Sequence, residues 1–469
     1  MDGGAHRSTE GWWRRAVARM LGVMQALPPR RPPGAPNPAP SRPASPTNLS
    51  GTNASGPWRP RHLLRAPHRI GFFLAMLVLL AGSLWWTEQQ FGRLGWIGLP
   101  VPAVSPTFTH ATVMVFGFMP LFFSGFLFTA GPKWLHVAPP DMRRVAAAAW
   151  AMGAGWLGWL AGACVGPWLA LSGLLAALLG FASMTAIFLG LVRASRAPDK
   201  VHARLVGLAL YLGTASLALL PVALLRHDAR LQHALTNGAL WSCVTLVFVT
   251  IAHRMIPFFT SSALPFVRAW RPCWVLWLMA GTCLAEAGLA WVEGYAPWSL
   301  SPAWVAALRG LAELAIGASL TALAVRWGLV QSLRDRLLAM LHLGFAWFGL
   351  ALLLGGCSQL LGWFGDAPAL PLAALHDLTM GCLGSLCLAM VTRVSCGHGG
   401  RPLVADGVVW CLFVLLQGAT LLRLAATVPD VPAQPLLALA ALLWTGVMLG
   451  WAARHLNWYG RPRPDGRPG

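Results

Sequence analysis

The chain has 469 residues, of which 56% are hydrophobic and only 11% are charged. Soluble globular domains carry about 25% charged residues, so this composition excludes a water-soluble enzyme and is typical of a polytopic helical membrane protein. The apolar runs are long and continuous, which excludes a β-barrel built from short alternating segments. The formal net charge is +20, yet the basic residues lie between apolar runs, so we expect no nucleic-acid partner.

The N-terminal region, residues 1–66, is expected to be a basic, Pro-rich cytoplasmic tail that is mostly disordered. Within it, Trp12–Leu27 is short, basic and amphipathic, which suits either an anionic membrane surface or an unstructured arm. We expect no cleavable signal peptide, because no adequate apolar stretch precedes a small-residue cleavage site. Residues 457–469 are expected to form a second cytoplasmic tail.

The segment 67–456 is predicted to be an all-α integral membrane domain with twelve transmembrane helices. Runs of about 17 to 25 apolar residues have the length that a helix needs to cross about 30 Å of hydrocarbon. The expected spans are 70–87, 110–130, 145–163, 167–192, 204–225, 233–253, 273–293, 303–325, 338–361, 371–392, 407–424 and 435–452. The third and fourth spans form a tight hairpin around Gly166 and Pro167.

The distribution of basic residues predicts the orientation of this domain. With a cytoplasmic N-terminus, 30 of the 35 Lys and Arg fall on inside segments and four on outside loops. Such a positive-inside bias requires an even number of spans. The sequence therefore predicts that both termini are cytoplasmic.

Nine cysteines are present, none in a CxxC pair and nearly all in or beside apolar runs. A disulfide framework and a four-cysteine zinc site are therefore not expected.

Three histidines open predicted spans at the same, outer end of the domain: His110, His233 and His376. The ten residues from His233 and the ten from His376 share His, Leu, Thr, Gly, Leu and Ser at equivalent positions, which indicates a shared local geometry. The glycine five residues after each histidine, Gly238 or Gly381, would let another group approach the helix backbone closely.

A histidine in the first turn of a helix stays neutral because the positive end of the helix dipole disfavours its protonation, so its lone pair remains available to haem iron or copper. Met114 and Met380 lie four residues after His110 and His376, on the same face of an α-helix, and a His/Met pair suits copper(I) or haem iron. Two alternatives stay open, namely methionines that only fill the core and histidines that only bond between helices.

A second polar cluster is expected at the inner end and includes Arg254, His398 and Arg401. His253, next to Arg254, also belongs to this inner cluster. The helix from His233 to His253 would be about 30 Å long, so no single metal can bind both clusters. The inner residues could bind anionic groups such as haem propionates, lipid phosphates or a nucleotide, or serve only as topology determinants. Pro257, shortly after Arg254, predicts that the sixth span stops there.

Ionisable residues also lie within the predicted spans, where they are costly. Arg309 and Glu313 in the eighth span are i,i+4 partners, which predicts a neutralised pair. Glu286 in the seventh span is a candidate for a proton route.

Several motifs together resemble the NnrS family. They are HATVMVFGF from His110, SGFLFTA from Ser124, RMIPFFT from Arg254, HDLTMG from His376 and HGGRPL from His398. The resemblance implies a multi-pass protein of the bacterial cell inner membrane that binds haem and copper and is linked to nitric oxide metabolism, denitrification and nitrosative stress. It implies His110 and His376 as axial haem ligands, and His233 with a nearby Met or Asn at a second metal.

A wider similarity is to haem-copper oxidases, which also have twelve helices and place haem ligands near the outer face. The paired histidines of their seventh helix are missing, so we expect no binuclear oxygen-reducing centre. Two alternative functions remain: a membrane transporter whose repeated histidine motifs form a substrate site, and a non-catalytic haem sensor.

Overall fold

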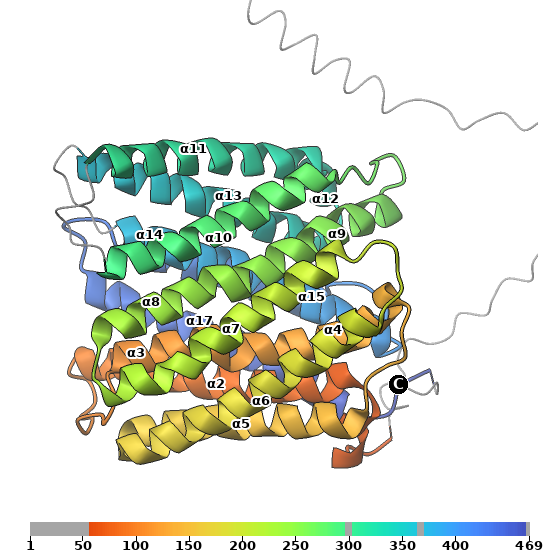
Figure 1. Cartoon of the computed structure of the whole chain (residues 1–469), viewed down its shortest axis with the longest axis horizontal. Coiled ribbons are helices and arrows are strands. Elements are labelled where there is room, and N and C mark those ends of the chain that lie inside the picture. The colour runs from red at the N-terminus through yellow and green to blue at the C-terminus, as the bar shows by residue number, and fades with distance from the viewer. Residues whose placement is uncertain (1–55, 296–302, 364–369, 466–469) are drawn as a thin grey trace, which may run out of the picture. The chain divides into compact units, whose positions relative to one another are not determined.

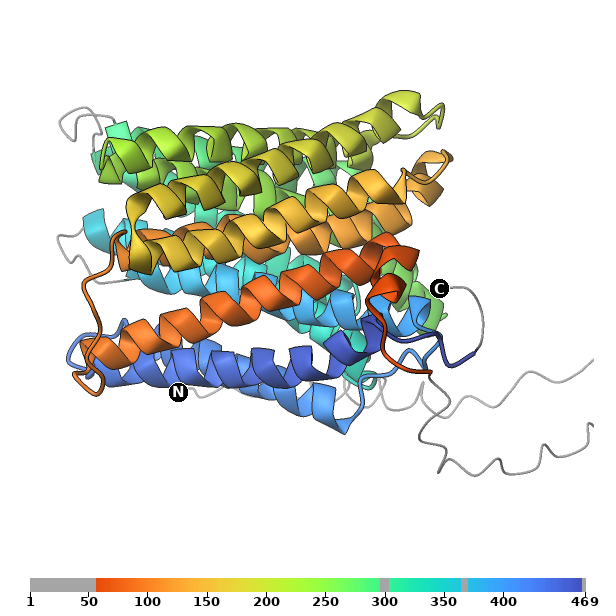
Figure 2. The same cartoon turned by 90° about the horizontal axis from the view of Figure 1, so that it is seen from below.

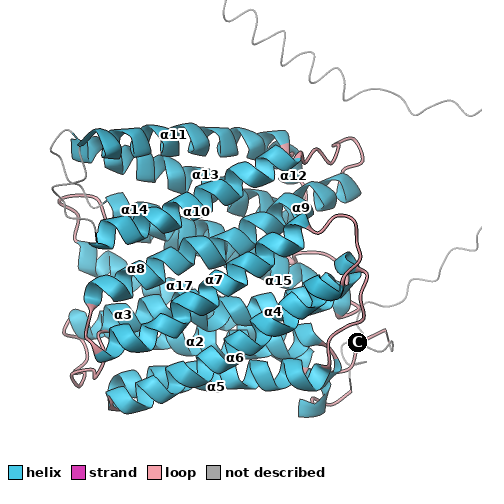
Figure 3. Cartoon of the chain, in the orientation of Figure 1, coloured by secondary structure: helices cyan, strands magenta, loops and turns pink. Residues whose placement is uncertain are grey.

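The computed structural model describes residues 56–295, 303–363 and 370–465. All described residues belong to one compact unit, Asn53–Gly469. The predicted N-terminal tail up to residue 55, including Trp12–Leu27, lies outside the described residues. The described part is entirely helical, with no strand (Figure 3).

Twelve helices in the described residues are long and apolar enough to cross a membrane, and their long axes run roughly alongside one another (Figure 1). Nine are continuous: α2 (Pro67–Arg93), α5 (Met142–Val165), α6 (Pro167–Ala194), α7 (Val201–Leu225), α10 (Cys273–Tyr295), α11 (Ala303–Arg326), α13 (Arg336–Trp363), α16 (Gly407–Ala425) and α17 (Ala433–Tyr459). The short α12 (Leu329–Ser332) and the 3₁₀ turn η2 (Pro60–Arg65) connect or precede them.

The second, sixth and tenth spans are each divided by a π-helix. The second consists of α3 (Pro106–Thr112), η3 (Val113–Gly117) and α4 (Phe118–Leu135). The sixth consists of α8 (Ala229–Ala239), η4 (Leu240–Thr245) and α9 (Leu246–Ala263). The tenth consists of α14 (Leu370–His376), η6 (Asp377–Gly384) and α15 (Ser385–His398).

The prediction of twelve spans is confirmed, including the hairpin in which α5 ends at Val165 and α6 begins at Pro167. The predicted stop at Pro257 is wrong, because α9 continues through this proline to Ala263. Proline interrupts helices in water, but within a bilayer helical geometry is retained because neighbouring groups satisfy the backbone that the proline frees. The helix α17 also extends seven residues beyond its predicted end at residue 452, because polar and aromatic residues continue a helix past the hydrocarbon.

The two ends of the described chain meet at one end of the bundle. Arg69 in α2 donates hydrogen bonds to the backbone oxygens of Tyr459 and Arg461, over distances of 3.1 and 2.8 Å. Figure 2 shows α2 and α17 side by side, and Thr87 and Thr445 bond across them at 2.8 Å. The even number of spans therefore places both chain ends at one face, which we call the arginine face. The opposite face, formed by α3, α8 and α14, is called the histidine face.

A helix cap at the arginine face provides a pH-dependent test of local stability. Asp406 accepts a hydrogen bond from the Val409 backbone N–H at 3.1 Å and pairs with Arg454. Burial opposes ionisation of Asp406, but these hydrogen bonds outweigh it and lower the pKa of the carboxyl. A carboxyl whose folded-state pKa is depressed adds stability above its unfolded pKa, and this stability is lost as the pH falls through the folded value.

We therefore expect Asp406→Ala to lower the free energy of unfolding by about 0.5–2 kcal/mol at neutral pH, with the difference disappearing in acid. Asp406→Asn keeps the helix cap but lacks the charge. It should therefore lose less stability than Asp406→Ala, and its stability should not depend on pH through this site. Thermal unfolding in detergent between pH 3 and 7 measures both. An Asp406→Ala defect that is equally large at every pH would contradict the assignment.

Candidate haem site at the histidine face

All three candidate histidines lie just before or at the start of a π-helix. His110 precedes η3, His233 precedes η4 and His376 directly precedes η6. A π-helix is rare and commonly marks a functional position in a transmembrane helix. Each of the three spans thus has a π-helix after its histidine, but the π-helix begins three residues after His110, seven after His233 and one after His376, so the repeat does not fix its position.

The glycines of the repeat have the role that the sequence predicted. A Cβ atom on Gly238 would lie 3.1 Å from Nε1 of Trp291 in α10, and one on Gly381 would lie 2.8 Å from the indole of Trp347 in α13. In both halves of the repeat, an indole from an adjacent span lies against the bare backbone of the glycine: the following span at Gly238 and the preceding span at Gly381. Any larger residue at Gly381 would displace that indole and separate the two spans.

His110 lies flat against an aromatic side chain of the first span. Its ring stacks on Trp86 with a centroid distance of 3.9 Å and an interplanar angle of 15°. The side chain is half-buried, and its Nδ1 is buried without a hydrogen-bond partner. A fixed, neutral imidazole with an unused ring nitrogen is suited to bind a metal.

His376 is held by its own helix in the manner of a metal-ligating histidine. Its Nδ1 donates a hydrogen bond to the backbone oxygen of Leu372 at 2.8 Å, which leaves the lone pair on Nε2. Such a bond fixes the tautomer and orientation of metal-binding imidazoles. His110 and His376 lie within electrostatic range of each other, and Arg423 of α16 lies within range of both. Of the three histidines, these two are therefore close enough to interact electrostatically with each other and with the Arg423 guanidinium.

His233 does not join this pair. Its side chain is exposed, because the buried face of α8 is formed by residues such as Ala234, Leu235 and Gly238. Among the described residues, no group of three or more His, Cys, Asp or Glu side chains is placed to hold one metal ion. The convergence of the three imidazoles on a shared cofactor therefore stays a prediction, with His110 and His376 its only members within electrostatic range of each other. Spacing along the chain cannot show which way the first turn of a helix faces.

The methionines occupy the same helices but not the expected register. Met114 lies within η3 and Met380 within η6. A π-helix closes i→i+5 hydrogen bonds, so the residue four positions after a histidine no longer lies directly above it. The methyl group of Met114 packs towards Gly82 of α2, where an added Cβ would lie 3.5 Å away. Both methionines remain predicted metal ligands.

The arginine face holds the second predicted group. Arg254 lies over the Trp134 ring at 4.9 Å, and Arg401 lies over Trp458 at 4.2 Å. Burial lowers the pKa of Arg401, and the nearby Arg454 lowers it further. The His398 ring lies 5.1 Å from that of the buried His68. His376 and His398 are 22 residues apart, about 33 Å of helix, so the two faces cannot share one cofactor.

The sequence reading missed several residues beside the histidines. Asp377 is fully buried and neither carboxyl oxygen has a hydrogen-bond partner in the structure. An acidic residue inside an apolar span is a signal that could have identified it. The stacking of Trp86 and the position of Arg423 carry no such signal, because they depend on how distant spans pack.

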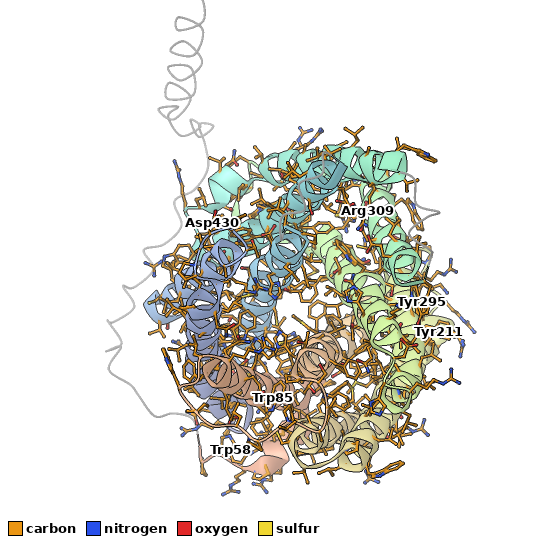
Figure 4. All side chains as sticks on the ribbon, turned by 90° about the vertical axis from the view of Figure 1, so that its left-hand side faces the viewer. Trp58, Trp85, Tyr211, Tyr295, Arg309 and Asp430 are labelled. Atoms are coloured by element: carbon orange, nitrogen blue, oxygen red, sulfur yellow. The ribbon has the colours of Figure 1, made fainter. Side chains whose placement is uncertain are left out.

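A separate ionic cluster joins α10 and α11 near the same face (Figure 4). Arg309 donates to Glu313 at 2.6 Å, as the i,i+4 spacing predicted, and to Glu286 at 2.8 Å. It also pairs with Glu293. Glu286 and Glu313 are buried, so one guanidinium compensates two buried carboxyls and a more exposed one.

The match to a known family is consistent with this architecture. The NnrS family, described as NnrS protein, matches residues 62–463, which include all twelve spans. No curated protein sequence matches the chain at a significant level. The match covers nearly the whole chain, and the motifs that first suggested the family lie on the interrupted spans and at the arginine face. The chain therefore belongs to the NnrS family.

Proposed function

We propose that this protein is an NnrS-type membrane haem protein that takes part in the response to nitric oxide, with haem held between His110 and His376. The observation that carries the proposal is the electrostatic proximity of these two imidazoles, one from the second and one from the tenth span, each with a ring nitrogen for iron. Haem supplies four ligands itself and needs only one or two from the protein. Two histidines therefore suffice.

The surrounding residues fit the same cofactor. Trp86 fixes the His110 ring by stacking. Arg423, within electrostatic range of both histidines, would pair with a propionate. Haem bound there would supply an iron that binds nitric oxide. The chain's own residues would hold it, set the imidazole tautomers and limit the access of water.

Copper has weaker support than haem in the described residues. His233, with Met114, Met380 or Asn237 nearby in sequence, remains a proposed second metal site. The arginine face, with Arg254, His398 and Arg401, is proposed to be cytoplasmic by the positive-inside rule and to contact lipid phosphates. A bacterial inner-membrane location follows from the same proposal.

The test is the haem content of the full chain purified in detergent. We expect His110→Ala and His376→Ala each to lose haem at least about tenfold, judged by the Soret band and iron analysis, while His233→Ala at the same face keeps it. Elution volume and helical content would show that each variant is folded. Unchanged haem in both alanine variants would refute the assignment.

A second candidate function is transport through the repeated motif. It is favoured by the matching π-helices and glycine–tryptophan contacts after His233 and His376, because transporters place substrate sites at interrupted, repeated helices. Protein that is free of haem and metal but catalyses flux into vesicles would support it. Bound haem with no turnover of nitric oxide would instead indicate a sensor.

A further inference from the structure

An apolar cavity lies between five spans, in the half of the bundle nearer the arginine face. Its volume is about 50 Å³, and its walls come from α2, α4, α9, α13 and α15. Every lining residue is Phe, Ile, Leu, Val, Ala, Met or Cys, and the walls include Phe72, Phe126, Phe248, Ile251 and Met390. The cavity offers no charged side chain and no strong hydrogen-bonding side chain to an occupant.

The cavity is distinct from the pair of candidate haem ligands. Leu386 in its wall follows His376 by ten residues, and Phe122 follows His110 by twelve. These spacings correspond to roughly 15–18 Å along the helices. A cofactor bound between the two histidines therefore leaves the centre of this cavity free.

On each of the three interrupted spans, residues that line the cavity follow within one or two turns of the end of the π-helix. The π-helix η3 ends at Gly117, η4 at Thr245 and η6 at Gly384. The first cavity residues that follow on these spans are Phe122, Phe248 and Leu386. Each π-helix shifts the α-helical register, so it helps set which side chains of α4, α9 and α15 face inward.

The polar groups nearest the cavity are bonded to other parts of the protein. His253 follows Ala252 of the wall, bonds to His202 at 3.0 Å and donates to the Pro272 backbone oxygen at 3.1 Å. Arg393, which precedes Val394 of the wall, lies over the Phe259 ring at 3.8 Å. These groups do not supply the cavity with a counter-charge for an ionic ligand.

We propose that this cavity binds small, uncharged, apolar molecules of the size of a dissolved gas. Apolar walls exclude ions and stable water clusters, and a volume of about 50 Å³ has room for a small molecule, because one water-sized molecule needs only about 10–15 Å³. The walls combine buried side chains such as Phe72 and Leu341 with half-buried ones such as Phe248, so the cavity is partly open at the side of the bundle. Molecules that concentrate in the bilayer would reach it between the helices.

Nitric oxide is a small, uncharged, apolar molecule of this kind. Only the choice of nitric oxide as the natural occupant of the cavity rests on the proposed function. The cavity would then hold the gas within the membrane, on the arginine-face side of the haem. Binding of an inert gas tests the cavity separately, because xenon needs neither haem nor chemistry.

The probe is xenon, measured by ¹²⁹Xe NMR of the full chain in detergent. We expect saturable binding to the wild type and at least a tenfold weaker affinity for Ala252→Phe, which places a ring inside the cavity. Ala147→Phe, at an exposed position of α5, is the matched control and should bind as the wild type does. Cys387→Leu is a smaller filling variant in case Ala252→Phe does not fold, and it should also weaken binding.

The outcomes separate this inference from the proposed function. Xenon binding that persists in His110→Ala and His376→Ala, whatever their haem content, supports a cavity independent of the histidine pair. The inference is overturned if the wild-type protein shows no saturable xenon binding, or if both filling variants bind xenon as tightly as the wild type does. A lipid or haem that copurifies with the wild type but is lost in Ala252→Phe would overturn it too, because the cavity would then hold a larger ligand.

Discussion

Replacing Arg309 by methionine is expected to lower the free energy of unfolding by about 3–5 kcal/mol, because it leaves buried carboxyls without their counter-charge. Glu286 and Glu313 are 7% and 4% exposed, and both pair with this single guanidinium. Methionine fills a similar volume, so the loss would come from charge and not from a void. Thermal unfolding of the purified chain, followed by tryptophan fluorescence, measures the effect.

Two further variants identify the cause of this loss. Adding Glu286→Gln and Glu313→Gln to Arg309→Met should recover most of the stability, because the uncompensated carboxyls are then gone. Arg326→Met removes another arginine of the same helix, which lies over Trp270 at 3.7 Å, and should cost only about 0.5–1 kcal/mol. Equal losses of stability for Arg309→Met and Arg326→Met would show that the ionic cluster contributes no more to stability than the Arg326–Trp270 contact does.

Gly162→Leu and Gly173→Leu should each force α5 away from α6. Overpacking of this kind lowers the free energy of unfolding by about 1–3 kcal/mol, and we expect both variants to reach or exceed the top of that range. A Cβ atom on Gly162 would lie 2.1 Å from the backbone nitrogen of Ala170, and one on Gly173 would lie 2.4 Å from that of Trp159. The obstacle is backbone in both cases, so no side chain can move aside. Small residues permit this close approach of membrane helices.

Gly190→Leu is the matched control, because it lies in the same helix α6 with nothing within 4 Å of its added Cβ. It should be neutral, or slightly stabilising through helix propensity. Thermal unfolding of the three variants side by side measures the difference. The close packing would not be essential if all three unfolded at the same temperature.

The positions of the spans could be read from the sequence because each one is locally determined. An apolar run of bilayer length must be helical, since hydrocarbon offers no other partner for the backbone. The Arg309–Glu313 pair was predictable for the same reason, because one helix fixes the spacing of both residues. The end of α9 was not, since the effect of Pro257 depends on its surroundings.

The candidate site was only partly predictable. His110 and His376 were predicted from the sequence as histidines that open spans at one end of the domain, and the structure adds Trp86 and Arg423, which come from other spans. His233 has nearly the same flanking sequence as His376, yet it is exposed. Flanking residues define a local conformation, whereas the direction in which it faces depends on how the whole span is packed.

The sequence alone determined that this protein crosses the membrane twelve times, that an even number of spans brings both described ends to one face, and that three spans carry a histidine at the opposite end. These properties follow from the transfer of local apolar and charged segments between water and lipid. Only the tertiary structure decided that His110 and His376 lie within electrostatic range of each other, that Arg309 joins three glutamates, and that five spans line an apolar cavity. Those features depend on contacts between residues far apart in the chain, and such contacts are fixed by the rotation and packing of whole helices.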